Sequence, residues 1–340
     1  MKTTIRRLTS AGTAKALLLA FTALPLAAPA QAGTDFILAN VMDAQNIQNV
    51  ASRAFIEKLE ELSGGEIEVE HHPGGDLGDW VGLFEQTMQG GIQMTQTWNA
   101  SEFDARLDLA TLGYTAGTWE ECVETYKPGG AMAGFWNSVF PDLNMHLAGI
   151  LPDGMYGVAV RKGVDAPTAF PGDAAGFKLR VPPIKIGITR FEALGFSAVP
   201  MPFSELYTAL QLGTVDGAAF QDAPTVATMA DVYDHYVRTS DICGYSFWLA
   251  NLDWWNGLSE SDRNTIQSAV DHAVTVAWAE FKAIDDRAIQ AMKDAGMEVH
   301  YLTDEELAAA KQIVYDTEWP WVEEQVGAET MAAVRAALGL

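Results

Sequence analysis

One arginine, Arg180, lies in a short apolar stretch, residues 178–181, that has the pattern of a strand. Burying an unpaired guanidinium is very costly, so an arginine in such a stretch needs an anionic partner. The partner is either a carboxylate of the chain, in a structural ion pair, or an anion from outside, whose carboxylate the planar guanidinium holds with two hydrogen bonds. Pro182 and Pro183 end the strand. Arg180 is therefore expected at a strand end, where α/β proteins bind ligands.

Aromatic and polar residues at or just beyond other strand ends, or just after the expected turn at Asp216-Gly217, are candidates for the walls of the same site. Ligand pockets are mostly apolar, with a few polar groups that fix the orientation of the ligand. Each aromatic residue taken alone is better explained by core packing, so the prediction rests on the set. The aromatic candidates are Trp98, Phe203, Phe220 and Trp248, and the polar candidates are Asp43, Gln45, Asn99, Gln221 and Asp222.

The sequence offers little for catalysis or for metal binding. It contains no GxSxG, HExxH, Walker-type or GxGxxG motif. His71 and His72 are adjacent in a predicted strand, so their rings point to opposite faces and suit one metal ion poorly. Acidic pairs arise by chance in a chain with 45 Asp and Glu and only 21 Lys and Arg. We therefore expect no catalytic residue, no metal ion and no cofactor.

The first 32 residues have the pattern of an export signal. Basic residues precede the apolar run 16–28, and Ala30-Gln31-Ala32 matches the site that a signal peptidase cuts. The apolar run is too short to span a membrane comfortably. Removal of this signal, which holds four basic and no acidic residues, changes the formal net charge from −24 to −28. Such acidity argues against binding to nucleic acid or to anionic lipid.

Length and cysteine content suggest how the mature chain is organised. A chain of about 310 residues is longer than one ordinary core, so two lobes are expected. Cys122 and Cys243 are the only cysteines. Export permits a disulfide between them, but their spacing fits no known framework or metal motif. Pairing and its absence both remain open at this point.

Strand and helix patterns alternate along the chain, which is typical of an α/β protein. Ser204 is the expected N-cap of one helix, and Gly213 is the expected left-handed residue after it. The expected strands are 36–40, 66–71, 93–97, 155–161, 178–181, 198–201 and 246–250. The expected helices are 46–62, 80–88, 186–194, 204–211, a long helix 260–291 and a terminal helix up to 340, with further helical material in 120–140.

Four stretches together resemble a known family. They are GGEIEVEHHPGGDLGD (64–79), QGGIQM (89–94), GFKLRVP (176–182) and LGFSAVPMPFSELYTALQLGTVDG (194–217). In type, order and spacing they are similar to the DctP-type extracytoplasmic solute-binding receptors of tripartite ATP-independent periplasmic (TRAP) transporters. The resemblance implies a periplasmic, two-lobed α/β receptor with a cleft and a long helix spanning both lobes. By analogy, one lobe holds 33–154 and 244–283, and the other holds 155–243 and 284–340.

The resemblance also implies roles for individual residues. In the family, the arginine of the KLRVP-like strand clamps the ligand carboxylate, and that position is Arg180 here. The aromatic residue of the PMPFSE-like segment lines the pocket, and that position is Phe203. The position three past the VDG glycine often holds an asparagine that contacts the ligand, but here it is Phe220.

A second departure concerns the strand before KLRVP, where many family members carry another arginine. The corresponding stretch is 153–160, and Met155 or Tyr156 stands near that position. The pocket is therefore expected to hold less positive charge and more aromatic surface than receptors for dianions. A monocarboxylate with an apolar, aromatic or zwitterionic remainder fits this expectation, and Asp43 is a candidate partner for a positive end.

The expected function is capture of a small organic acid by domain closure and its delivery to an ion-gradient-driven membrane permease. A monomer without nucleic-acid partners and without membrane insertion is expected. Several alternatives stay open: a sensor subunit that signals to a membrane kinase, a receptor for dicarboxylates or sugar acids, a receptor that feeds an ATP-driven importer, and a periplasmic enzyme on a similar scaffold.

Overall fold

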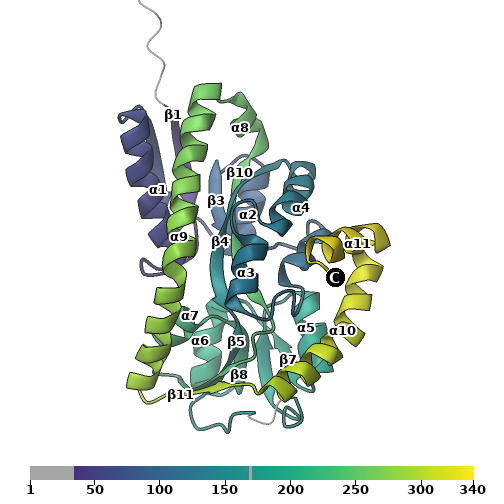
Figure 1. The fold of residues 1–340 in the computed structure, drawn as a ribbon. Helices are drawn as coiled ribbons and strands as arrows, with labels where there is room; N and C mark the ends of the chain where they lie inside the picture. The colour runs from purple at the N-terminus through teal and green to yellow at the C-terminus, as the bar shows by residue number, and fades with distance from the viewer. Residues whose placement is uncertain (1–33, 168–170) are drawn as a thin grey trace, which may run out of the picture. The chain divides into compact units, whose positions relative to one another are not determined.

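Two β-sheets organise the residues described by the computed structural model, 34–167 and 171–340 (Figure 1). The predicted signal, residues 1–32, lies outside them. The five-stranded sheet has the order β2-β1-β3-β10-β4, with β1 (Thr34–Ala39), β2 (Ile67–His72), β3 (Met94–Thr97), β4 (Met145–Met155) and β10 (Cys243–Asn251). The six-stranded sheet has the order β11-β9-β5-β8-β6-β7, with β5 (Gly157–Arg161), β6 (Lys178–Val181), β7 (Ser197–Pro200), β8 (Gly217–Gln221), β9 (Tyr233–Arg238) and β11 (Glu298–Tyr301).

Helices connect the strands and cover the sheets. The α-helices are α1 (Ile47–Ser63), α2 (Trp80–Met88), α3 (Trp119–Tyr126), α4 (Ala131–Val139), α5 (Lys185–Ala193), α6 (Phe203–Leu212), α7 (Ala223–Thr228), α8 (Leu252–Gly257), α9 (Glu260–Asp294), α10 (Asp304–Val326) and α11 (Ala328–Ala337). Two 3₁₀ segments, η1 (Ala105–Thr111) and η2 (Phe140–Leu143), complete the set. None of the helices in the described part combines the length and the apolar composition that a membrane crossing requires.

Parallel pairing in each sheet places the carboxyl ends of neighbouring strands side by side. In the first sheet β1 pairs in parallel with β2 and β3, while β10 runs antiparallel to β3 and β4. In the second sheet β6 pairs in parallel with β7 and β8. Local sequence sets the helices between them: Asn46 caps α1 by accepting from the backbone N–H of Gln48, and Gly213 ends α6 with a φ of 67°. The expected cap at Ser204 is wrong, because α6 already begins at Phe203 after Pro202.

The chain passes between the two sheets three times, twice through short neighbouring segments and once through α8 and the long helix α9. The first joins β4 to β5, the second joins β9 to β10, and they hydrogen-bond to each other: Tyr156 N–H donates to the Ile242 carbonyl at 3.0 Å, and Ser240 N–H donates to the Tyr156 carbonyl at 2.9 Å. The long helix α9 packs against α1 and β4 and also against α7 and β11, so it contacts elements of both sheets (Figure 1). The precise lobe boundaries stay a prediction. Helix α10 contacts both α5 and η1, and α11 contacts α4.

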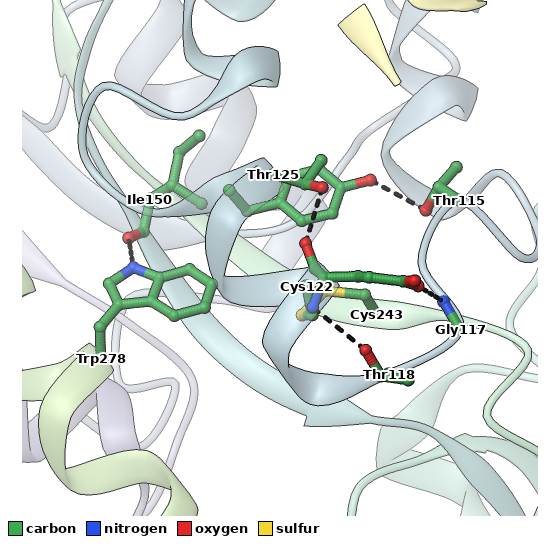
Figure 2. The surroundings of a disulfide bond; sticks show 10 residues. Thr115, Gly117, Thr118, Cys122, Thr125, Ile150, Cys243 and Trp278 are labelled. Atoms are coloured by element: carbon green, nitrogen blue, oxygen red, sulfur yellow. Dashed lines mark hydrogen bonds between the residues drawn. A yellow bond between two sulfur atoms is a disulfide. The ribbon is translucent and has the colours of Figure 1, made fainter. Parts of the chain in front are cut away.

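A disulfide joins Cys122 of α3 to Cys243 of β10, which answers the question that spacing left open (Figure 2). The two Cα atoms are 5.7 Å apart, and the cysteines are separated by 121 residues in sequence. Both side chains are buried. Close by, the Trp278 indole N–H donates to the Ile150 carbonyl at 2.9 Å, which fixes α9 to β4 (Figure 2). The disulfide thus ties α3 to the start of β10 in the first sheet.

Replacing both Cys122 and Cys243 by alanine is expected to lower the free energy of unfolding by about 2–4 kcal/mol, because a long loop of the unfolded chain is no longer closed. Urea denaturation of both proteins in oxidising buffer measures the difference. Urea denaturation of the wild type in the presence of a reductant should give the same free energy of unfolding as the variant. Equal stability of the variant and the oxidised wild type would contradict the prediction.

Candidate functional site

A cavity of about 130 Å³ lies at the ends of strands from both sheets. Its walls are mainly apolar and aromatic, as in typical small-molecule sites. The aromatic wall residues are Trp80, Trp98, Tyr156, Phe203, Phe220 and Tyr245. The other wall residues are Val41, Met42, Asn99, Ala110, Thr111, Arg180, Pro182, Ile184, Gln221, Asp222, Thr225, Ile242 and Gly244.

Arg180 is the positive group of this cavity, and it lacks an acidic partner in the part of the chain that the structure describes. Its side chain projects from β6 and is only 3% exposed. Its Nε–H donates to the Met201 carbonyl at 2.9 Å, and its guanidinium lies 6.0 Å from the centre of the Phe203 ring. No carboxylate oxygen within the described ranges comes within 4.0 Å of it. Burial lowers the pKa of Arg180 to about 10. The structural ion pair considered from sequence is thus not formed here.

Two buried carboxylates lie at or just behind the wall of the cavity. Asp222 lines the cavity and caps α7, where it accepts from the Thr225 backbone N–H at 2.8 Å. Asp153 lies behind the aromatic wall and accepts from the Trp98 indole N–H at 2.5 Å. Burial raises the pKa of Asp222 to about 6 and the pKa of Asp153 to about 7. The negative charge of Asp222 raises the pKa of Asp153 further.

Gln221 supplies an unused hydrogen-bond acceptor next to Asp222. Its amide N–H₂ donates to the carbonyls of Ala219 and Phe220, both at 3.1 Å. Its Oε1 atom is buried and has no hydrogen-bond partner within the described residues. An unsatisfied buried acceptor carries a desolvation penalty. A donor group of a bound molecule would satisfy it.

Two glycines make room for the aromatic walls. A Cβ atom at Gly244 would lie 2.2 Å from the Tyr156 ring, and one at Gly187 would lie 3.0 Å from the Phe220 ring. Phe220 itself has a φ of 59°, a conformation that disfavours a bulky residue. Strained backbone of this kind clusters at ligand sites.

Most residues that the sequence singled out line this one cavity. They are Trp98, Asn99, Tyr156, Arg180, Phe203, Phe220, Gln221 and Asp222. Asp43 and Gln45 do not: both are exposed and outside the cavity, and the Asp43 carboxylate accepts from the backbone N–H groups of Gln45 and Asn46 in a local turn. Trp248 does not either, because it is fully buried in the core, 5.0 Å from the Phe55 ring. Asp43 and Trp248 are therefore left out of the proposed site.

The sequence reasoning missed Trp80, Tyr245 and Asp153. Trp80 begins α2 directly after its N-cap Asp79, a position that ordinary helix packing explains equally well. Asp153 had one signal, an acidic residue within an apolar stretch, but β4 itself was not predicted.

Arg190 forms a second buried arginine site beside the cavity, and the sequence analysis did not identify it. Its Nε–H donates to Glu318 Oε2 at 2.6 Å, and one terminal N–H₂ donates to Glu318 Oε1 at 2.8 Å. The other donates to Asp241 Oδ2 at 3.0 Å. The Arg190 guanidinium also lies 5.5 Å from the centre of the Phe220 ring. All three charged side chains are at most 1% exposed, so this arginine is fully paired.

Replacing Asp153 by asparagine is expected to raise the free energy of unfolding at pH 7 by about 2–4 kcal/mol, since each unit of pKa shift corresponds to about 1.4 kcal/mol. The pKa of Asp153 rises from 3.8 to about 7 on folding, so the folded chain binds more protons between those values. Its contribution to stability is therefore lost as pH rises through that window. Asparagine still accepts from Trp98 but carries no charge. Denaturation between pH 4 and 8 checks this, with the exposed Asp43→Asn as control. A pH profile unchanged by Asp153→Asn would contradict it.

The chain matches a protein family over most of its length. The model of the DctP family, the bacterial extracellular solute-binding proteins of family 7, covers residues 38–317. The chain belongs to this family. DctP-family members of TRAP transporters are binding receptors for transport rather than enzymes, and they deliver small molecules to membrane permease subunits. The resemblance to TRAP receptors and the expected α/β receptor fold are thereby confirmed.

Curated relatives of this DctP-family chain differ in the ligands that they are named for. The C4-dicarboxylate-binding periplasmic protein DctP of Rhodobacter capsulatus is 36% identical over 181 residues, which cover 51% of this chain and 52% of that protein. The ectoine-binding periplasmic protein TeaA of Halomonas elongata is 25% identical over 289 residues, which cover 82% of each chain.

Solved structures share the fold. The ectoine-binding protein of the TeaABC TRAP transporter of Halomonas elongata superimposes with a TM-score of 0.83 at 22% identity, over 90% of this chain and 99% of that one. The sugar-acid-binding protein DctPAm of Advenella mimigardefordensis, in complex with galactonate, gives a TM-score of 0.81 at 20% identity, over 90% and 97% of the two chains. At these identities the likeness concerns the fold alone.

Proposed function

We propose that this protein captures a small monocarboxylate whose other end carries a hydrogen-bond donor or a positive charge. The observation that carries the proposal is Arg180, a buried guanidinium that lines the cavity and has no acidic partner among the described residues. Its desolvation is unfavourable until an anion supplies the missing charge. A ligand carboxylate meets that need with charge-assisted hydrogen bonds.

The other end of the ligand is proposed from Gln221 and Asp222. Asp222 is a buried carboxylate, and the Gln221 Oε1 atom is a buried acceptor without a partner among the described residues. Both favour a ligand group that donates hydrogen bonds, above all a cationic one. A dianion is disfavoured, because Arg180 is the only arginine or lysine among the residues that line the cavity. The aromatic walls suit an apolar or planar body between the two ends.

Export to the periplasm, closure around the ligand and delivery to an ion-gradient-driven permease complete the proposal. The relatives support it, since those named above are periplasmic binding proteins. Hinge closure would exclude water and strengthen the interactions of the buried charges. The two hydrogen-bonded segments at Tyr156 and Ser240–Ile242 are where such a motion would bend the chain.

Thermal unfolding against a panel of organic acids tests the ligand class. The panel should contain zwitterions such as ectoine and amino acids, aromatic monocarboxylates, sugar acids and C4-dicarboxylates. A ligand at about 100 times its Kd adds roughly 2.7 kcal/mol to the free energy of unfolding. We expect zwitterions or donor-bearing monocarboxylates to give the largest shift. A shift caused by dicarboxylates alone would replace the proposal with the dicarboxylate alternative.

Replacing Asp222 by asparagine tests the proposed positive end of the ligand. Loss of a charged hydrogen-bond partner is expected to weaken binding of a cation-bearing ligand by about tenfold to a hundredfold. Binding of an analogue without that cation should not change. The matched control is Asp79→Asn, because Asp79 caps α2 as Asp222 caps α7 but does not line the cavity. If Asp222→Asn weakened the binding of the cation-bearing ligand and of the analogue equally, the assigned role of Asp222 would be contradicted. Isothermal titration calorimetry gives the affinities.

A further inference from the structure

Three side chains with metal-binding atoms meet on one face of the second sheet, at its β11 edge. Strands β9 and β11 are parallel, and Glu298 is the direct register partner of His235. His300 follows Glu298 by two positions, so the pleat of β11 places both on the same face. The opposite face is the core side, where Val299 and its register partner Tyr236 pack. The sheet geometry therefore brings His235, Glu298 and His300 together without help from loops.

The distances among the three ligand atoms are those of a coordination polyhedron. His235 Nδ1 and His300 Nε2 are 3.4 Å apart. Glu298 Oε2 lies 3.8 Å from His235 Nδ1 and 3.5 Å from His300 Nε2. Ligand bonds of about 2.0–2.2 Å in a tetrahedral zinc site place the ligand atoms roughly 3.3–3.6 Å from one another. The two distances that involve His300 fall in this range, and the distance of 3.8 Å between Glu298 and His235 needs only a small side-chain shift to reach it.

We propose that His235, Glu298 and His300 bind one divalent transition-metal ion of the Zn²⁺ class. Two imidazoles and a carboxylate suit Zn²⁺, Cu²⁺ or Ni²⁺, whereas Ca²⁺ and Mg²⁺ require a larger set of oxygen ligands. The Glu298 carboxylate has no lysine or arginine ion-pair partner within the described ranges. The acidic chain, with a formal net charge of −24, attracts cations to its surface. The side chains of His235 and His300 are 21% and 29% exposed, which leaves a fourth position for water.

The metal would act on the edge of the second sheet and not on the ligand cavity. Strand β11 is the edge strand, and it connects the end of α9 to the start of α10. An ion shared by β9 and β11 would fasten this connection. None of the residues that line the cavity belongs to either strand. The metal site is therefore independent of the proposed function.

Equilibrium dialysis with elemental analysis, together with thermal unfolding, tests the site. The purified protein should be freed of any affinity tag, stripped with EDTA and titrated separately with Zn²⁺, Ca²⁺ and Mg²⁺. We expect one Zn²⁺ per chain, with a rise in the unfolding temperature, and no response to Ca²⁺ or Mg²⁺. His300→Ala should weaken Zn²⁺ binding at least about tenfold, because loss of a group that merely supports a ligand already has an effect of that size.

Two further variants decide between this site and general surface binding. Glu298→Gln changes an exposed side chain, so it tests the third ligand without threatening the fold. His72→Ala is the matched control: His72 also pairs with a glutamate on a strand, Glu70 at 2.9 Å, but has no second histidine in that pair. We expect Glu298→Gln to weaken binding and His72→Ala to leave it unchanged. Unchanged Zn²⁺ affinity in both His300→Ala and Glu298→Gln, or an equal loss in His72→Ala, would overturn the proposal.

Discussion

Replacing Arg180 by methionine is expected to remove most of the binding affinity for the carboxylate ligand and to leave the ligand-free protein at least as stable. A buried charge that loses its partner weakens binding by about 2–5 kcal/mol, which corresponds to roughly 30-fold to several thousand-fold in Kd. Without ligand, the Arg180 guanidinium is buried with one hydrogen bond, to the Met201 carbonyl. Methionine fills similar space and removes the unfavourable desolvation of the charge, which offsets the loss of that bond.

Calorimetry with the ligand found in the acid panel and urea denaturation without ligand together measure both effects. Arg161→Met is the matched control. Arg161 also projects from the second sheet, and its Nε–H donates to the Val215 carbonyl at 3.2 Å, but it has Asp216 at 3.8 Å and lies outside the cavity. That variant should bind the ligand normally. If Arg180→Met bound the acid as tightly as the wild type, the assignment of Arg180 as the carboxylate clamp would fail.

The parts of the site that were predictable depend on local sequence. Residues 178–181 form β6 and residues 80–88 form α2 because proline, glycine and capping residues bound apolar runs at those positions. In the folded chain, the parallel pairing of β6 with β8 brings Arg180 and the residues after β8 to the same end of the second sheet. The same reasoning gave a wrong prediction for Asp43. A residue that follows a strand can also close its own turn, as the Asp43 carboxylate does by accepting from the Gln45 backbone N–H.

The parts that were not predictable depend on distant partners or on strands without a clear period. Nearly every residue of strand β4 is buried, and the strand contains glycine and proline. Its sequence therefore shows no alternation of polar and apolar residues. Strands β8, β9 and β11 were missed as well. Arg190 resembles an ordinary residue of a short helix, and its partners Asp241 and Glu318 lie 51 and 128 residues away. No local pattern distinguishes this fully paired arginine from Arg180, which has no acidic partner within residues 34–167 and 171–340.

Replacing Arg190 by methionine is expected to have the opposite effect to Arg180→Met, namely a large loss of stability. Arg190 neutralises Glu318 and Asp241, and the carboxylate of Glu318 also accepts from the Gly113 backbone N–H at 2.7 Å. Without the guanidinium, two carboxylates stay buried without a countercharge. Breaking a buried ion pair from one side lowers the free energy of unfolding by about 3–5 kcal/mol. Because the network joins α5, α10 and the segment before β10, the loss should affect unfolding of the whole chain.

A triple variant separates lost charge balance from lost packing. Arg190→Met combined with Glu318→Gln and Asp241→Asn removes all three charges and keeps hydrogen-bonding groups at both acidic positions. It should recover a substantial part of the stability that Arg190→Met loses, since uncompensated charge is the main cause of the loss. The single variant should also lose less stability at acidic pH, because burial raises the pKa of Glu318 and protonation of that carboxylate removes part of the buried charge. Urea denaturation at pH 5 and pH 8 measures both effects. A triple variant no more stable than Arg190→Met would show that shape complementarity, and not charge balance, is what Arg190 contributes.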